Sequence, residues 1–312
     1  MKLVDLCCGC GGLSLGMLMS NHQVISAFDN DPAAVDNYNL NIADHARLAN
    51  LNELSADDLP DCDGIIGGPP CQPFSNGHQN YAMQAGAGKG PGDQRNALPD
   101  FVRLIVEKHP TFFLIENVPG LLQYPAFLAE QLGRLFKAGY FPVPAILTAW
   151  KFGVPQERRR LFIMGYLNGK LPQWPTPTTN TRDASVSTWA TVRDMLSQET
   201  SRPKPPWIER KFQGRDRIII DTRNRGYTPQ RGRYFHAHSI DLPSYTVLAS
   251  ERRGSKVIVI GNRCWQVTAD HNRKLQTFPD SWQFPDNNNT AQRLIGNAVP
   301  PLLAQRIGQV IT

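Results

Sequence analysis

Short apolar segments alternate with amphipathic segments over the first 165 residues of this 312-residue chain, and this order constrains its fold more than any other feature. The apolar segments have the length of strands, and the amphipathic segments have the periodicity of helices. We predict strands at residues 2–6, 24–28, 63–67, 111–115 and 161–166, and helices at 13–20, 32–40, 98–108 and 127–137. This order is typical of an α/β fold with a doubly wound, mostly parallel sheet.

Glycine-rich and polar segments directly follow the predicted strands. Gly9–Gly12 follow the first strand, Asp29 follows the second, Pro70 and Cys71 follow the third, and Glu116 follows the fourth. Ligands of doubly wound sheets bind at the carboxyl ends of the strands. We therefore expect the functional site of this region at that edge of the sheet.

The composition changes at about residue 168. Residues 168–262 are rich in Pro, Arg, Thr and Asn, with strand candidates at 217–221 and 256–260, and a helix is predicted near 301–310. We predict one domain formed by residues 1–167 with 290–312, and a second, smaller, irregular domain with β-strands formed by residues 168–289.

The net charge of +6 is unevenly distributed along the chain. Residues 1–150 carry a net charge of −7, whereas residues 151–263 carry +12. Within the basic segment, residues 202–235 hold ten cations against three acids, interleaved with five aromatic side chains. This pattern favours a polyanionic partner for the second domain, with a solvated basic surface as the alternative.

Several classes of protein do not fit the sequence. No apolar run approaches the roughly 18 residues of a membrane-spanning helix, and the first residues lack a signal-peptide pattern, so we expect a soluble, cytoplasmic protein that binds no membrane. The cysteines fit neither a disulfide framework nor a zinc site, so we predict no metal. A lone C-x-x-C leaves a redox function as an alternative; the six cysteines are Cys7, Cys8, Cys10, Cys62, Cys71 and Cys264.

The glycine-rich turn after the first strand is suited to close approach of a ligand to the backbone. The dinucleotide motif G-x-G-x-x-G is not met, because Ser14 occupies the position of its third glycine. Asp29 stands where an acidic side chain can bind a ribose diol. These features favour a nucleoside cofactor without a pyrophosphate, and an ordinary tight turn is the alternative.

Cys71 directly follows two prolines at the predicted carboxyl end of a strand. Prolines restrict the backbone there, which suits an exposed nucleophile better than a core thiol. Glu116 ends the next buried strand, and Arg158 and Arg160 alternate in a segment that, if extended, points both side chains the same way. A buried structural cysteine is the alternative for Cys71 considered alone.

In these motifs the chain resembles the DNA (cytosine-5) methyltransferases. The resemblance covers nearly the whole chain, and its motifs occur in the order found in that family. They are the glycine-rich turn Asp5–Gly12, Pro70-Cys71-Gln72, Glu116-Asn117-Val118, Gln156-x-Arg158-x-Arg160 and Gly296-Asn297-Ala298-Val299-Pro300. The resemblance implies a Rossmann-like, S-adenosylmethionine-dependent methyltransferase domain joined to a smaller target-recognition domain.

The resemblance also implies a role for each catalytic residue. Cys71 would attack carbon 6 of a cytosine that is flipped out of duplex DNA. Glu116 would hold ring nitrogen 3 and the amino group, and Arg160 would bind ring oxygen 2. Arg158 would orient the site and steady the loop that carries the nucleophile.

The same resemblance assigns the ligand-binding residues. S-adenosylmethionine, which leaves as S-adenosylhomocysteine, would be bound by Asp5, Cys7, Gly9, Gly11, Gly12, Leu13, Asp29, Asn30, Asn50, Leu51, Pro70, Asn297 and Val299. Double-stranded DNA would be bound by Gln72, Ser75, Arg95, Arg215, Arg217, Arg223, Arg225, Arg231, Arg233 and Thr246, with Ser75 and Thr246 on phosphates beside the flipped nucleotide.

Several positions depart from the family pattern. Cys7 stands where the family has an aromatic residue, Asn30 replaces an apolar or aromatic neighbour of the adenine, and Asn50 replaces an Asp that accepts the adenine amino group. Asp29 replaces the usual Glu. These changes predict weaker cofactor binding than is typical, and near residues 265–271 the family's Arg…Arg-Glu pattern is lost.

Two other functions share these motifs. A tRNA cytosine-5 methyltransferase would carry a Cys-Phe-Thr tripeptide, which the sequence lacks. A catalytically silent DNA-binding homologue would have lost Cys71, Glu116 or the paired arginines, and all are present. We expect a bacterial or phage enzyme that acts at the nucleoid as a monomer on DNA, with a cognate restriction endonuclease as a possible partner.

Overall fold

The structure is a computed structural model. It describes residues 1–70, 90–93, 95–167, 169–178, 242–249 and 267–312, and the backbone of short strands at 202–203, 217–219, 237–238, 257–260 and 263–266. The chain divides into two compact units. The first consists of Met1–Thr148, Arg159–Thr176 and Leu303–Thr312, and the second of Ala149–Arg158 and Pro177–Leu302. The predicted division into a domain of 1–167 with 290–312 and a domain of 168–289 stays a prediction.

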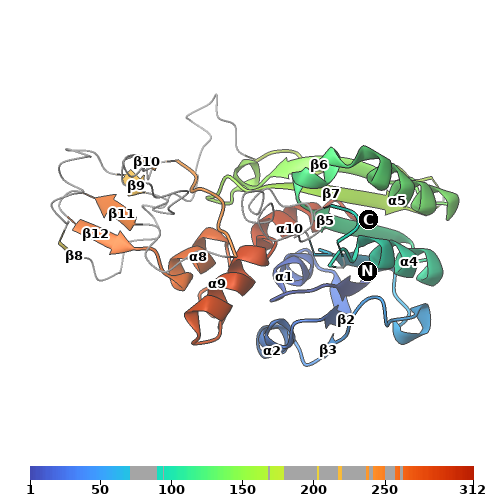
Figure 1. Ribbon diagram of the computed structural model, residues 1–312, viewed down its shortest axis with the longest axis horizontal. Coiled ribbons are helices and arrows are strands. Elements are labelled where there is room, and N and C mark those ends of the chain that lie inside the picture. Colours follow the sequence, from blue (N-terminus) through green and yellow to red (C-terminus); the bar gives the residue numbers. More distant parts are fainter. Residues whose placement is uncertain are drawn as a thin grey trace. The chain divides into compact units, whose positions relative to one another are not determined.

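The first unit contains a seven-stranded sheet in the order β3-β2-β1-β4-β5-β7-β6 (Figure 1). The pairs among the first five strands of that order are parallel, whereas β7 is antiparallel to both β5 and β6. The predicted α/β fold with a mostly parallel sheet is confirmed. The strands are β1 (Lys2–Leu6), β2 (Gln23–Asp29), β3 (Ala46–Leu48), β4 (Gly64–Gly67), β5 (Phe112–Asn117), β6 (Val143–Thr148) and β7 (Arg159–Tyr166).

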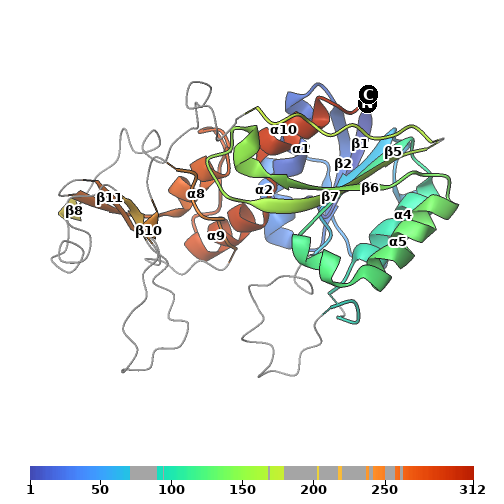
Figure 2. The same cartoon turned by 90° about the horizontal axis from the view of Figure 1, so that it is seen from above.

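Helices cover both faces of this sheet (Figure 2). Successive side chains of a strand point to opposite faces of the sheet, so the apolar central strands give both faces an apolar surface that helices cover. Val4, Ile65 and Ile115 belong to the core cluster that includes Phe101 of α4 and Leu128 of α5. The helices are α1 (Gly12–Met19), α2 (Pro32–Asn41), α4 (Leu98–Lys108), α5 (Pro125–Lys137) and α10 (Pro301–Gly308), with short 3₁₀ turns η1 (Ala56–Asp58) and η4 (Pro119–Gln123). In Figure 2, α4 and α5 lie on one side of the sheet and α1 and α10 on the other.

Local sequence signals set several of these helix ends. Asp31 caps α2, because its side chain accepts a hydrogen bond from Ala33 N at 3.1 Å, and Pro32 occupies the first turn. α4 ends where His109 adopts a left-handed conformation with φ 57°. The predicted bounds 2–6 and 98–108 are those of β1 and α4.

Two strands of this unit were not predicted. β6 is the edge strand of the sheet, and it alternates half-buried and exposed residues, with Pro144 and Ile146 exposed. A proline is tolerated there because one edge of such a strand has no ladder partner. β3 at the opposite edge is only three residues long.

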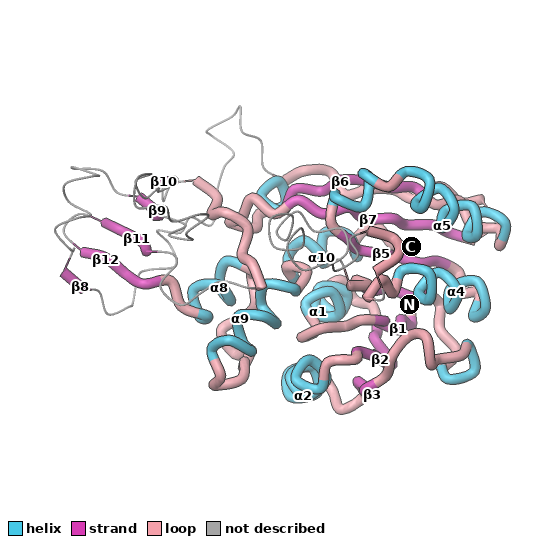
Figure 3. Tube along the Cα trace, in the orientation of Figure 1, coloured by secondary structure: helices cyan, strands magenta, loops and turns pink. Residues whose placement is uncertain are grey.

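The described part of the second unit contains a five-stranded antiparallel sheet in the order β10-β9-β11-β12-β8, two helices and a 3₁₀ turn (Figure 3). Within its described part, Val247, Ile258, Leu275 and Ile295 form a buried apolar cluster. The elements are η5 (Ala149–Phe152), β8 (Arg202–Pro203), β9 (Arg217–Ile219), β10 (Ala237–His238), β11 (Val257–Ile260), β12 (Arg263–Gln266), α8 (Ala269–Leu275) and α9 (Asn288–Asn297). Among the described residues of the whole chain, no helix is long and apolar enough to cross a membrane.

Candidate active site

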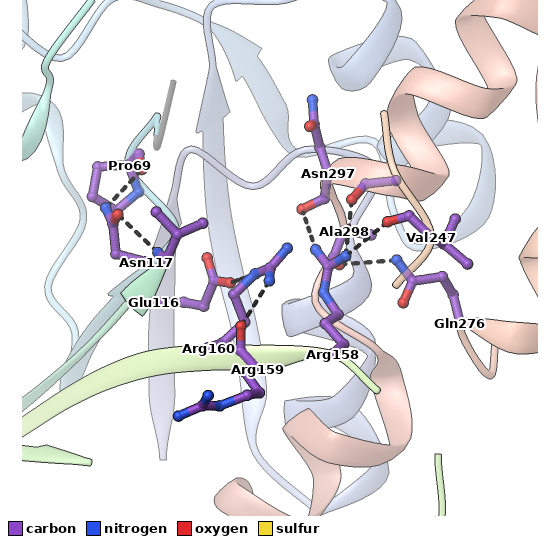
Figure 4. A network of polar contacts seen from close by, with 12 residues as sticks. Pro69, Glu116, Asn117, Arg158, Arg159, Arg160, Val247, Gln276, Asn297 and Ala298 are labelled. Carbon is purple, nitrogen blue, oxygen red and sulfur yellow. Dashed lines mark hydrogen bonds and ion pairs between the residues drawn. The ribbon is translucent and has the colours of Figure 1, made fainter. Parts of the chain in front are cut away.

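Glu116 and Arg160 meet at the carboxyl edge of the seven-stranded sheet (Figure 4). Glu116 lies near the end of β5 and Arg160 near the start of the antiparallel neighbour β7, so the topology brings them to the same edge. Arg160 Nε lies 2.9 Å from Glu116 Oε1, and both side chains are largely buried, at 14% and 10% exposure. The contact is an ion pair that lacks the alignment of a hydrogen bond. Arg159, which stands between Arg158 and Arg160 in the sequence, is exposed and points away from this ion pair.

The segment after β4 is held close to this ion pair. A Cβ atom on Gly68 would lie 3.0 Å from Glu116 Oε2, so a larger residue there would push the carboxylate aside by a few tenths of an ångström. Asn117 Nδ2 donates to Pro69 O at 3.3 Å, and Asn117 Oδ1 accepts from Val118 N at 2.9 Å. These contacts fix the backbone up to Pro70, the residue that precedes Cys71. Cys71, Gln72 and Ser75 themselves lie outside the described residues.

The glycine-rich turn after β1 is held by a carboxylate. Asp29 Oδ2 accepts from Gly9 N at 2.8 Å, and its Oδ1 accepts from Asp31 N at 2.9 Å. Burial raises the pKa of Asp29, although these backbone hydrogen bonds oppose the shift. Gly9 and Gly11 both have positive φ, 55° and 87°, and a Cβ on Gly11 would lie 2.6 Å from Ile42 Cδ1. A Cβ on Gly9 would have no neighbour within 4 Å, so the turn leaves open space beside its backbone.

Behind this turn runs a chain of buried polar side chains. Ser14 Oγ donates to Asp5 Oδ2 at 2.5 Å, Tyr38 Oη donates to Ser14 Oγ at 3.1 Å, and Tyr38 Oη lies 3.1 Å from His45 Nε2. Burial raises the pKa of Asp5 to about 7, with the Ser14 hydrogen bond lowering it and the charge of Asp29 raising it. Asp5 thus lies under the turn and braces α1 through Ser14.

The remaining predicted cofactor residues of the first unit differ in exposure. Cys7 is half-buried with φ 62°, and burial raises its pKa well above the ordinary thiol value, so this thiol is a poor nucleophile. Asn30 and Asn50 are exposed, and Asn50 Nδ2 donates to Glu53 Oε1 at 3.0 Å. This orientation points the carbonyl oxygen of Asn50 away from Glu53. Gly12, Leu13 and Leu51 are buried.

These residues fit a nucleoside cofactor with a positive charge. The turn offers open backbone at Gly9 and a carboxylate at Asp29, and Asn50 offers an exposed amide. Among the described residues, no group of three or more His, Cys, Asp or Glu side chains could hold a metal ion.

Arg158 belongs to the second unit and is only 1% exposed. Its Nη1 donates to Val247 O at 3.2 Å and to Gly296 O at 3.1 Å, and its Nη2 donates to Asn297 O at 3.4 Å (Figure 4). Thr246, a predicted phosphate contact, donates from Oγ1 to Glu157 O at 2.9 Å. Asn297, the last residue of α9, is exposed, and Val299 just after the helix is buried.

Most of the predicted DNA-reading residues cannot be placed. The side chains of Arg215, Arg217, Arg223, Arg225, Arg231 and Arg233 lie outside the described residues, although the backbone of Arg217 belongs to β9. Arg95 is described, and its Nη2 forms an ion pair with Asp93 Oδ2 at 2.5 Å while its side chain stays 51% exposed.

Sequence reasoning did not predict the structural roles of three polar residues of the second unit, although Gln156 stands in one of the family motifs. Gln156 and Gln276 are both fully buried and hydrogen-bonded to each other at 2.9 Å. His271 was noted only as a departure from the family pattern, yet its Nδ1 accepts from Thr268 N at 3.1 Å and completes a capping box at the start of α8. The spacing Thr-x-x-His was the available signal, with His in the place of the usual Glu.

A family model, C-5 cytosine-specific DNA methylase, matches residues 1–312. Among curated proteins, the chain is similar to the Type II methyltransferase M.AplI of Arthrospira platensis, with 30% identity over 99% of this chain and 85% of that protein. It is also similar to the Type II methyltransferase M.NlaX of Neisseria lactamica, with 31% identity over 96% of this chain and 92% of that protein.

Solved structures share the fold. The Dnmt2 methyltransferase of S. pombe superposes with a TM-score of 0.68 at 19% identity, covering 98% of this chain and 96% of that one. The Entamoeba histolytica methyltransferase EhMeth gives a TM-score of 0.65 at 18% identity, covering 98% and 96%. The match of the family model over the full length, together with these likenesses, shows that the chain belongs to the C-5 cytosine-specific DNA methylase family.

Proposed function

We propose that this chain transfers a methyl group from S-adenosylmethionine to carbon 5 of a flipped cytosine within a specific sequence of duplex DNA, with Cys71 as the nucleophile. The observation that carries the proposal is the Glu116–Arg160 pair beside the anchored segment Gly68–Pro70. A carboxylate and a guanidinium at one edge can bind the polar edge of a pyrimidine ring. Cys71 is the next residue after that segment.

The chemistry requires a nucleophile because carbon 5 of cytosine reacts poorly with electrophiles. The Cys71 thiolate would form a bond to carbon 6, and the electron pair of the 5,6 double bond would move to carbon 5. Glu116 would hold the proton at ring nitrogen 3, and Arg160 would donate to ring oxygen 2, so charge on the ring is stabilised. After methylation, loss of the carbon 5 proton would expel the thiolate and restore the double bond.

The cofactor would bind at the turn after β1. When bound, S-adenosylmethionine would supply an electrophilic sulfonium methyl group. Asp29 would bind the ribose and Asn50 would accept the adenine amino group, with Cys7, Asn30 and Leu51 nearby; Asp5, Gly9, Gly11, Gly12, Leu13, Pro70, Asn297 and Val299 would complete the site. The exposed amide of Asn50 and the small thiol of Cys7 support the expectation of weaker than typical binding.

DNA would be bound by the basic region of the chain. Phosphate contacts would position the protein, and a few arginines would read base edges. Thr246 and Ser75 would contact phosphates beside the flipped base, with Gln72, Arg95, Arg215, Arg217, Arg223, Arg225, Arg231 and Arg233 as further contacts. Residues 168–289 would form the target-recognition domain. Several cations on phosphates would make the affinity fall steeply with salt.

The likeness to Type II methyltransferases supports a place in DNA modification. We propose that the chain acts as a monomer on the DNA of a bacterium or its phage, beside an endonuclease that cuts the same site. Its base-flipping mechanism would expose the target carbon, which is inaccessible inside a duplex.

A methyl-transfer assay tests the proposal. Purified protein, tritiated S-adenosylmethionine and either duplex DNA or tRNA are incubated side by side, and enzymatic methylation sequencing of the DNA then identifies the modified site. We expect label in DNA at cytosines of a single sequence. Label in tRNA and none in DNA would replace this function by RNA methylation, and label in neither would contradict it.

A further inference from the structure

Two glutamine side chains are completely buried in the second unit. Gln156 and Gln276 are each 0% exposed, and a buried amide is costly unless its polar atoms are hydrogen-bonded. Gln156 Oε1 accepts from Val247 N at 2.8 Å, and Gln156 Nε2 donates to Gln276 Oε1 at 2.9 Å. Gln276 Nε2 in turn donates to Ile295 O at 2.6 Å and to Ala298 O at 3.2 Å. The two amides thus form one continuous chain of hydrogen bonds from Val247 to Ile295 and Ala298.

This chain of hydrogen bonds ends at two segments, and each segment has its own proposed ligand. At one end, Val247 directly follows Thr246, which would contact a DNA phosphate. At the other end, Ala298 lies between Asn297 and Val299, which would contact the cofactor. Gln276 itself comes from the end of α8 and belongs to neither segment.

Other contacts tie the same two segments together. Arg158 donates to Val247 O and to Gly296 O, and Gln292 of α9 donates to Leu248 O at 2.7 Å. A Cβ on Gly296 would collide with the backbone of Leu248 and Ala249, so the end of α9 and the loop 244–249 touch backbone to backbone. Such close packing transmits a displacement of one segment to the other.

We propose that Gln276 is a positioning residue that holds the loop 244–249 and the turn 296–299 in one arrangement, so that a single side chain sets both DNA and cofactor affinity. The inference rests on the proposed function. Through its described side-chain contacts, Gln276 acts on Val247 by way of Gln156 and on the carbonyls of Ile295 and Ala298. It touches no reacting atom, so its loss acts on binding more than on the chemical step.

Gln276→Met tests the proposal, because methionine has a similar length and no amide. We expect the KM values for DNA and for S-adenosylmethionine to rise together, each by about tenfold, while kcat stays within about threefold. Gln283→Met, at an exposed glutamine of the same unit, is the matched control and should leave all three values unchanged. A change in kcat alone, or in one KM alone, would overturn the inference.

A double-mutant cycle separates positioning from general destabilisation. Thr246→Val alone should raise the KM for DNA, and adding it to Gln276→Met should cause little further increase, because both changes act on one loop. Effects that multiply would show that Gln276 does not act through Thr246. Should Gln276→Met fail to give a cooperative thermal melt, Gln276→Asn serves instead, since it keeps an amide without burying a charge but is one methylene too short to reach both Gln156 and the carbonyls of Ile295 and Ala298.

The failure of this inference is distinguishable from the failure of the proposed function. A wild-type chain that methylates no DNA would contradict the function. A wild-type chain that methylates DNA, together with a Gln276→Met variant of unchanged KM values, would overturn only the role of Gln276.

Discussion

Arg160 and Arg158 both have little exposed surface, and their charges are compensated differently. At the carboxyl edge of the seven-stranded sheet, Arg160 lies against the carboxylate of Glu116. In the second unit, Arg158 donates to the backbone carbonyls of Val247, Gly296 and Asn297. The two arginines stand only two residues apart in the sequence.

The difference distinguishes a site suited to bind a reacting ligand, at the edge of the sheet, from an arginine with a structural role in the second unit. A charge pair without full hydrogen-bond alignment can accept a polar ligand between or beside its members. An arginine that donates to several carbonyls fixes the backbone that carries them, and its removal leaves those carbonyls buried without a donor. We therefore expect the first region to respond to substitution in chemistry and pH dependence, and the second in stability and ligand binding.

The largest effect is expected for Glu116→Gln. The amide keeps the size of the side chain but cannot hold a proton for the ring, so kcat should fall about 100-fold or more. The measurement is single-turnover methyl transfer. Glu107→Gln, which removes a carboxylate paired with Arg103 on the surface of α4, is the control and should keep full activity. A kcat within tenfold of wild type for Glu116→Gln would show that the Glu116–Arg160 pair has a structural role, as Arg158 has in the second region.

Asp5→Asn tests the pH dependence of the buried polar side chains behind the turn after β1. Because burial raises the pKa of Asp5 to about 7, the folded protein binds this proton more tightly than the unfolded chain does, and the stabilisation is lost as pH rises from about 4 to 7. Above pH 7 the asparagine variant should exceed wild type in unfolding free energy by up to about 4 kcal/mol.

Denaturant titrations of both proteins at several pH values check this expectation. Asp36→Asn, at an exposed position of α2, is the control and should run parallel to wild type. A difference between Asp5→Asn and wild type that does not change with pH would show that Asp5 stays ionised in the folded protein.

Matched substitutions of the two arginines sharpen the comparison directly. Arg158→Met should lower the unfolding free energy by about 3 kcal/mol, because carbonyls of the loop 244–249 and of α9 lose their donors. Arg160→Met should lower it less, by about 1 to 2 kcal/mol, because it breaks one contact to a carboxylate that keeps some exposure rather than contacts to several carbonyls. Equal losses in urea unfolding would remove the distinction between the two regions.

The smallest effect is expected at the cofactor turn. Asn50→Asp should tighten binding of S-adenosylhomocysteine about threefold, because a carboxylate accepts a stronger hydrogen bond from an amino group than an amide does. Isothermal titration calorimetry checks the value. Asn52→Asp adds the same charge at a neighbouring exposed position and should have no effect. An equal gain in both variants would assign the effect to charge alone.

The sequence predicts the parts of this fold that depend on local pattern. β1 and α4 have the predicted bounds because a buried strand and an amphipathic helix each carry a periodic signal. β6 lacks that signal, since an edge strand with Pro144 is half exposed and obtains its register from β7. The Glu116 and Arg160 positions follow from motif and topology together.

The buried polar contacts of the second unit could not be predicted in the same way. Gln156 and Gln276 are 120 residues apart, and Arg158 lies 138 residues from Gly296, so no window of sequence contains both partners. The acceptors of Arg158 are backbone carbonyls, which every residue has. His271 shows the converse, because the capping box that it forms with Thr268 spans only four residues and lies within one short window of sequence.

The nucleophile is the central claim, and a covalent trap tests it most directly. Wild type and Cys71→Ser are incubated with S-adenosylmethionine and a duplex that carries 5-fluorocytosine at the methylated position, and the products are resolved on a denaturing gel. Fluorine at carbon 5 cannot leave as a proton does, so the account predicts a stable protein–DNA adduct for wild type and none for Cys71→Ser. Methyl transfer to ordinary DNA by Cys71→Ser at the wild-type rate, or an adduct that forms without Cys71, would contradict it.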